Sequence, residues 1–149
     1  MSRSQEEFFR LVVAFIRQNS LAVLSYMQND DQPSGACADF VVLPGSGRPR
    51  LGFSTSVKPP YRKVPALRRN PKVAVTFFSG VQNKTVQCQG IVREVGESEL
   101  RTQLEETFEE ARFFTRKAGA VFFEVDLTWI RYADYGNNEE PFDLQEISF

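Results

Sequence analysis

The chain has 149 residues, a formal net charge of −1, and 42% hydrophobic and 25% charged residues. This composition is typical of one globular domain, which we expect to span residues 1–149. The near-zero charge argues against a barrel that binds single-stranded nucleic acid through a basic surface. The chain has no histidine, which excludes a Ser-His or Cys-His nucleophile and a histidine metal ligand. We therefore expect no metal site.

No apolar run is long enough to span a bilayer, and the first residues do not have the pattern of a signal peptide. We therefore expect a cytoplasmic protein that does not contact a membrane. In a chain without an export signal, Cys37 and Cys88 are expected to be free, buried thiols rather than a disulfide.

The sequence pattern in the N-terminal part of the chain predicts one helix followed by strands. Residues 1–19 should form an amphipathic helix, because several large apolar residues recur on one face: Phe8, Leu11, Val12, Phe15 and Ile16. Apolar runs separated by turn residues then predict strands at residues 21–27, 35–43 and 51–53.

The remaining elements follow the same reasoning. A short basic helix after residue 61 should stop at Asn70-Pro71, because the residue before a proline is disfavoured in the α region. Beyond it the pattern predicts strands at residues 73–77, 85–95 and 120–132, a hairpin loop at 80–84, a helix at 98–117 and an acidic tail at 137–149.

A hydroxyl-rich turn, Ser54-Thr55-Ser56, leads into the basic helix. Between Asp39 and Glu94 there is no acidic residue, but there are ten basic ones. Hydroxyl and cationic groups at the end of a strand suit a phosphate dianion, because charge-assisted hydrogen bonds are the strong kind. The alternative is a solvated basic helix face, which is what most charge runs are.

The order of short motifs in this region resembles a known family. The motifs are Phe53-Ser54, Arg62-Lys63, Asn70-Pro71-Lys72-Val73 and Gly90. Together they resemble the pyridoxamine 5′-phosphate oxidase-like flavoproteins, which are FMN-binding split barrels. The resemblance implies a mainly β fold, a six-stranded antiparallel Greek-key barrel with flanking helices. It also implies a homodimer that binds FMN in a cleft between its subunits.

The resemblance assigns candidate cofactor residues to positions of this chain. The phosphate candidates are Ser54, Thr55, Arg62, Lys63 and Lys84, with Phe53 at the end of the same strand. Cys37, Ala38 and Asp39 would lie along the flavin ring; alternatively, the small residues there simply face a tight core. Where the oxidases proper carry Arg-Gln, this chain has Lys84-Thr85, and Gln87 is the candidate replacement for the amide. Trp129 is either the aromatic residue that reaches the flavin site or a core residue.

The implied function is that of an FMN-dependent oxidoreductase acting on an unknown small molecule, with a nicotinamide donor as a candidate partner. One alternative is a flavin-binding carrier or sensor without turnover. Another is a nucleic-acid-binding barrel, which the net charge of −1 disfavours. Haem and deazaflavin are bound elsewhere in this superfamily, and the missing histidine argues against haem. No catalytic side chain is identified. The chain also lacks the C-terminal Arg-Leu-His segment of the oxidases proper, so we expect no efficient oxidation of pyridoxine or pyridoxamine phosphate.

Overall fold

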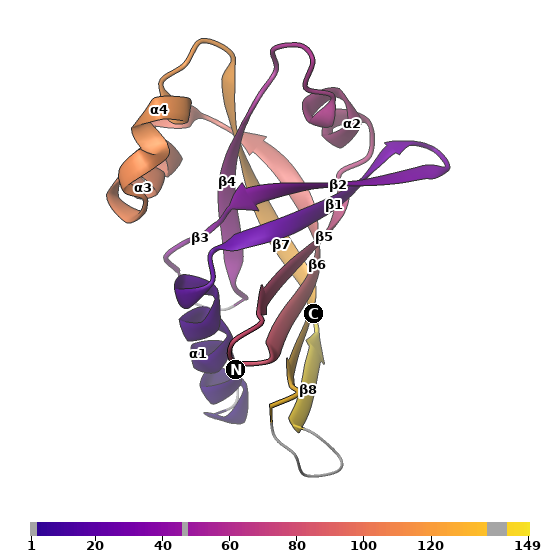
Figure 1. The fold of residues 1–149 in the computed structure, drawn as a ribbon, viewed down its shortest axis with the longest axis vertical. Coiled ribbons are helices and arrows are strands. Elements are labelled where there is room, and N and C mark those ends of the chain that lie inside the picture. The colour runs from indigo at the N-terminus through magenta and orange to yellow at the C-terminus, as the bar shows by residue number, and fades with distance from the viewer. Residues whose placement is uncertain (1–2, 46–47, 137–142) are drawn as a thin grey trace.

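The computed structural model describes residues 3–45, 48–136 and 143–149. It contains one eight-stranded sheet with helices around it (Figure 1). The strands are β1 (Leu21–Asn29), β2 (Gln32–Asp39), β3 (Val41–Val42), β4 (Arg50–Ser56), β5 (Lys72–Ser79), β6 (Lys84–Val95), β7 (Ala120–Asp134) and β8 (Asp143–Ser148). The helices are α1 (Arg3–Gln18), α2 (Lys63–Arg69), α3 (Glu97–Thr107), the 3-10 turn η1 (Glu109–Ala111) and α4 (Arg112–Thr115).

The sheet has the strand order β2-β1-β5-β6-β7-β4-β3, and β8 pairs separately with β7. All of these strand pairs are antiparallel. Although β2 and β4 are far apart in this order, they contact each other, so the sheet curls into a half-closed barrel. The predicted split-barrel fold is confirmed. The predicted number of six strands is wrong, because the structure adds the short β3 and the C-terminal β8.

The centre of the barrel is aromatic. Phe53 on β4 lies between Phe40 and Phe123, with ring centroids 5.1 and 5.5 Å away, and Phe77 on β5 lies 5.7 Å from Phe40. All four side chains are almost completely buried. Each aromatic side chain buries about 150–250 Å² in such a core, so this cluster is a large part of what holds the strands together.

Two predicted elements are divided in the structure. The strand expected at residues 35–43 is interrupted at Phe40, whose backbone N–H donates to the Ser20 carbonyl rather than to a strand partner. The helix expected at residues 98–117 breaks at Phe108, which has an extended backbone (φ −119°, ψ 117°). Its side chain packs against the second, smaller core formed by α3, η1 and the neighbouring strands. Tertiary packing of Phe108 therefore overrides the helical pattern.

The N-terminal helix and the C-terminal strand meet at one end of the barrel. Phe9 of α1 is buried and stacks on Phe149, with ring centroids 5.6 Å apart. Leu11, expected on the buried face, is 39% exposed instead. The described part of the acidic tail forms β8 along the end of β7, while residues 137–142 lie outside the described residues. None of the helices in the described residues is long and apolar enough to cross a membrane.

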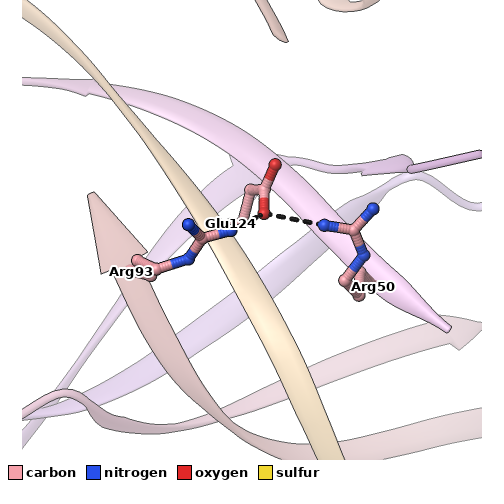
Figure 2. Close-up of polar contacts among 3 residues, drawn as sticks. All are labelled: Arg50, Arg93 and Glu124. Atoms are coloured by element: carbon pink, nitrogen blue, oxygen red, sulfur yellow. Dashed lines mark hydrogen bonds and ion pairs between the residues drawn. The ribbon is translucent and has the colours of Figure 1, made fainter. Parts of the chain in front are cut away.

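An ion-pair cluster links the three neighbouring strands β6, β7 and β4. Glu124 on β7 accepts hydrogen bonds at Oε2 from Arg50 of β4, at 3.0 Å, and from Arg93 of β6, at 2.7 Å (Figure 2). The Glu124 side chain is only 18% exposed. This shared carboxylate adds side-chain contacts to the backbone pairing of the three strands. β4 is the strand whose end carries the site described next.

Candidate functional site

A pocket of about 620 Å³ lies at the end of β4, where the chain leaves the sheet toward α2. Its walls come from β4, the loop before α2, α2 itself and the turn between α4 and β7. These segments meet because Ser54–Ser56 pair with residues 120–122 at the start of β7. The prediction of a turn at residues 54–56 is wrong, because these residues continue β4 and pair with β7. The pocket forms where the end of this strand meets the turn before β7, which the sequence analysis did not consider.

Hydroxyl and ammonium groups line this pocket. The hydroxyl residues are Ser54, Thr55 and Ser56, the cations are Lys58, Lys63 and Lys117, and the ring-bearing walls are Pro59, Pro60, Tyr61 and Phe114. No carboxylate is among the described lining residues. A pocket with several cations and no anion of its own is suited to a negatively charged ligand.

The hydroxyl groups are partly engaged by the main chain. Ser54 donates its hydroxyl proton to the Val121 carbonyl at 3.2 Å, so its oxygen can accept a hydrogen bond but must rotate to donate one. Ser56 Oγ accepts from the Lys58 backbone N–H at 3.1 Å, which leaves its own proton available. Thr55 lines the same pocket. Ser56, which the resemblance did not assign, is thus as well placed as Ser54 to donate to a phosphate.

Lys63 is the first residue of α2, and its side chain is half-buried. Burial lowers the pKa of its ammonium group, and this effect outweighs the opposing influence of the nearby Cys37 thiol. In the described part of the chain, no ion pair links Lys63 to a carboxylate. A cation that loses water without gaining a partner is stabilised by a bound anion.

Two of the predicted phosphate residues lie outside this pocket. Arg62 directly precedes α2 and is exposed, and it is not among the lining residues. Lys84 begins β6, where its Nζ lies 3.8 Å from Asp134 Oδ2 at the end of β7. The pocket lies beside Ala120, at the start of that strand. The two ends of this 15-residue strand are roughly 45 Å apart along its length.

Three further candidates, Thr85, Gln87 and Trp129, lie on β6 and β7. Thr85 pairs with Ala133, Gln87 with Arg131 and Trp129 with Gln89. Trp129 is half-buried, and the Arg131 guanidinium lies 5.0 Å above its ring. Arg131 also donates to Glu146 of β8. Within one subunit, none of these residues is among the described lining residues of the Lys63 pocket.

The candidates on β2 and β4 differ in how far their side chains are buried. Ala38 packs against the main core, which favours the structural alternative for the small residues there. Phe53 is completely buried among other rings, so its side chain is unavailable to a ligand. Asp39 is half-buried, and burial raises its pKa despite a hydrogen bond from Ser20, with nearby Glu110 adding to the increase.

The cysteines are free, as predicted, but only one is buried. Cys37 is exposed on β2, which corrects the expectation for that residue. Cys88 is buried on β6, and burial raises the pKa of its thiol to about 12. Cys88 is therefore a packing residue, whereas Cys37 lies near Lys63 and partly offsets the lowering of the Lys63 pKa by burial.

Sequence reasoning missed Lys58 and Lys117 as pocket residues. Lys58 stands in the basic stretch, but the family motifs do not include it. Lys117 falls at the end of what looked like one continuous helix, and its place beside β4 depends on the break at Phe108 and the turn before β7. Gly119, the last residue of this turn, has a φ of +89° and is a sequence signal that the chain bends sharply there.

Residues 9–134 match the family model described as pyridoxamine 5′-phosphate oxidase. The chain belongs to this family. The match covers most of the chain, including β1 to β7 and the whole pocket. No curated protein matches the chain in sequence.

Several solved structures share the fold of this pyridoxamine 5′-phosphate oxidase family member. A general stress protein 26-related protein from Clostridium acetobutylicum is 12% identical, with a TM-score of 0.71, and 97% of this chain and 96% of that one are covered. A pyridoxamine 5′-phosphate oxidase-related, FMN binding protein from Nostoc punctiforme PCC 73102 is 9% identical, with a TM-score of 0.63 and coverage of 100% and 99%. A heme binding protein from Mycobacterium smegmatis is 11% identical, with a TM-score of 0.69 and coverage of 90% and 55%.

Proposed function

We propose that this protein binds FMN, with the cofactor's phosphate in the pocket at the end of β4. The observation that carries the proposal is the half-buried ammonium group of Lys63, which has no carboxylate partner in the described residues and lies beside the hydroxyls of Ser54–Ser56. Charge-assisted hydrogen bonds from such groups each contribute about 1.5–3 kcal/mol. Membership of the family and a structural neighbour named as an FMN binding protein support the same cofactor.

The donor set fits FMN better than haem. A flavin phosphate needs cations and hydroxyl donors, which this pocket supplies. Haem iron takes its axial ligand from His, Cys, Met or Tyr, and this chain has no histidine. Haem would therefore depend on one of the less common ligands. The neighbours named for heme binding and for FMN binding are 11% and 9% identical to this chain, so the donor set of the pocket, rather than the neighbours, favours FMN over haem.

We further propose that the protein is an FMN-dependent oxidoreductase. FMN supplies hydride and electron transfer at its ring. The chain's own residues then have the tasks of binding and orienting: Lys63 and the β4 hydroxyls would hold the phosphate. A reduced nicotinamide dinucleotide is the candidate electron donor. The alternative, a flavin carrier or sensor without turnover, differs only in the absence of a substrate.

We also propose a homodimer, in which candidate residues outside the pocket would contact the cofactor bound by a second copy. Lys84, Gln87 and Trp129 are not among the described lining residues of the Lys63 pocket of their own subunit. In a dimer with the flavin between subunits, one copy would provide the phosphate pocket and its partner the ring contacts. The exposed apolar side chains near the β5–β6 hairpin, Phe78 at 57% and Val81 at 99% exposure, are surfaces that a second copy could cover.

The direct test is a titration of the purified protein with FMN, followed by flavin fluorescence and absorbance. Saturable binding with a Kd in the micromolar range or below supports the proposal. The loaded protein is then mixed with a reduced nicotinamide dinucleotide under anaerobic conditions, where bleaching of the flavin separates an oxidoreductase from a carrier. Absence of FMN binding at millimolar concentration would overturn the assignment of the cofactor.

A further inference from the structure

We propose that a groove between α1 and β3 binds a small monocarboxylate with an apolar body, through the guanidinium groups of Arg10 and Arg17. The groove has a volume of about 480 Å³, which lies within the roughly 300–1,000 Å³ range of small-molecule sites. This site goes beyond the proposed cofactor function, because its described lining residues include none of those that line the pocket at the end of β4.

The groove lies near the beginning of β4, whereas the cofactor pocket lies at its end. One wall is α1, and the other is β3 with the segment that leads to Pro49, directly before β4 starts. The cofactor pocket begins at Ser54 on the same strand. Figure 1 shows α1 beside β3 and well away from α2, the helix that carries Lys63. A ligand in this groove therefore does not compete with FMN for space.

The floor of the groove is apolar. Phe9 and Leu43 are buried, and Val13 and Val42 are half-buried. Phe9 is held from another side by Phe149, whose ring centroid lies 5.6 Å away. Among the described lining residues, no side chain carries a hydroxyl or an amide group. The groove thus offers contacts to hydrocarbon, and its polar recognition depends on charged side chains alone.

Two arginines border this floor. Arg10 and Arg17 are seven residues apart, which places them on one face of α1, two turns and about 10 Å apart along the axis. Neither forms an ion pair with another residue in the described part of the chain. Glu6 is the single carboxylate among the described lining residues. The lining therefore has a net charge of +1.

This combination favours a monocarboxylate over other anions. The planar guanidinium fork matches a carboxylate in a bidentate contact, and one carboxylate balances the net charge of the lining. A phosphate dianion would exceed that charge and would find no hydroxyl donors in the described lining. Charged helix faces are usually only solvated, but these two cations border an apolar floor, where attraction to an anion is less screened than in open water.

The test is isothermal titration of the full chain with octanoate, kept below its micelle concentration, and with 1-octanol as the uncharged match. We expect saturable binding of octanoate and at least tenfold weaker binding of 1-octanol. Binding should weaken in Arg10→Gln and in Arg17→Gln, and by about tenfold or more in the double variant, the loss expected for a charged hydrogen bond. Arg112→Gln, at an exposed arginine of α4 outside the groove, should behave as wild type.

A second variant tests the groove itself. Ala14 is exposed on α1 and lines the groove, so Ala14→Phe should fill it and abolish octanoate binding while the circular dichroism spectrum and FMN affinity stay as in wild type. Octanoate should also shift the backbone amide NMR signals of α1 and β3 rather than those of Ser54–Ser56.

The proposal is overturned if octanoate does not bind at millimolar concentration, or if 1-octanol binds as tightly. Wild-type affinity in the double arginine variant or in Ala14→Phe, or shifts confined to the end of β4, would also overturn it. Replacing octanoate by 3-phenylpropionate shows whether the groove prefers an aliphatic or an aromatic body. Because these measurements need no FMN, their outcome is independent of whether the cofactor assignment is correct.

Discussion

Gly90 of β6 lies directly against the main chain of Asp126 in β7: a Cβ at Gly90 would stand 2.6 Å from the Asp126 carbonyl oxygen. The same Cβ would lie 2.7 Å from Val125 Cγ1. The pairing of β6 with β7 shifts register between Gln89 and Gly90, so an irregularity in the ladder brings the two backbones together. Gly90 is therefore required by close approach rather than by an unusual dihedral angle.

This contact predicts that Gly90→Ala destabilises the protein strongly. The obstructing atom belongs to the backbone and cannot rotate away, so we expect a loss of about 1–3 kcal/mol or more in the free energy of unfolding. Gly80→Ala is the matched control, because a Cβ there meets nothing within 4 Å. Urea unfolding should leave Gly80→Ala within about 0.5 kcal/mol of wild type. Equal stability of the two variants would contradict the close approach.

Glu105 should make stability depend on pH in the acidic range. The bidentate contact with Arg116 is the main reason that the pKa of Glu105 falls from 4.5 to about 2. Because the folded-state pKa is depressed, the contribution of Glu105 to stability is present above about pH 4.5 and is lost as the pH falls toward 2. Glu105→Gln should therefore lose less stability than wild type between pH 5 and pH 2.5.

The pH experiment has a control on the same helix. Glu106 is exposed, and Glu106→Gln should keep the wild-type dependence on pH. Denaturant unfolding followed by circular dichroism at several pH values measures the difference. Parallel losses in wild type and Glu105→Gln would show that Arg116 does not hold the Glu105 carboxylate in solution.

We predict a homodimer with twice the 17.0 kDa mass of one chain. An obligate interface of this kind buries on the order of 2,000 Å² or more and depends on apolar contacts. Phe78→Asp should weaken the dimer, because it places a charge on the exposed apolar surface near the β5–β6 hairpin. Phe113→Asp, at a residue that is 74% exposed on α4, is the matched control. Light scattering that returns the monomer mass for wild type at micromolar concentration would refute this prediction.

Much of the fold could be predicted from local patterns. The alternation in residues 85–95 and 120–132, and the stop at Asn70-Pro71, each follow from backbone geometry and correspond to β6, β7 and the end of α2. The break at Phe108 could not be predicted, because it depends on a side chain packing into a core that exists only after folding. The pairing of β8 with β7 likewise depends on contacts between distant segments.

The candidate site, like the fold, could be predicted from the sequence only in part. Ser54, Thr55 and Lys63 were predicted from a motif in one stretch of chain, and the structure brings them into one pocket. Lys117 joins them through the break at Phe108 and the turn before β7, which a single sequence does not reveal. Lys84, Gln87 and Trp129 lie elsewhere on the barrel, and their role in the cofactor site stays a prediction that a second subunit would have to fulfil.

The central claim is that Lys63 holds the phosphate of FMN, and the most direct measurement compares FMN with riboflavin, which lacks the phosphate. Dissociation constants of both are measured by fluorescence for wild type, Lys63→Ala and the control Lys72→Ala. We expect Lys63→Ala to weaken FMN by about 1.5–3 kcal/mol, roughly 10–150-fold, and to leave riboflavin nearly unchanged, because only FMN has the partner for the ammonium group. Equal losses for the two flavins, or no loss for either, would contradict the account.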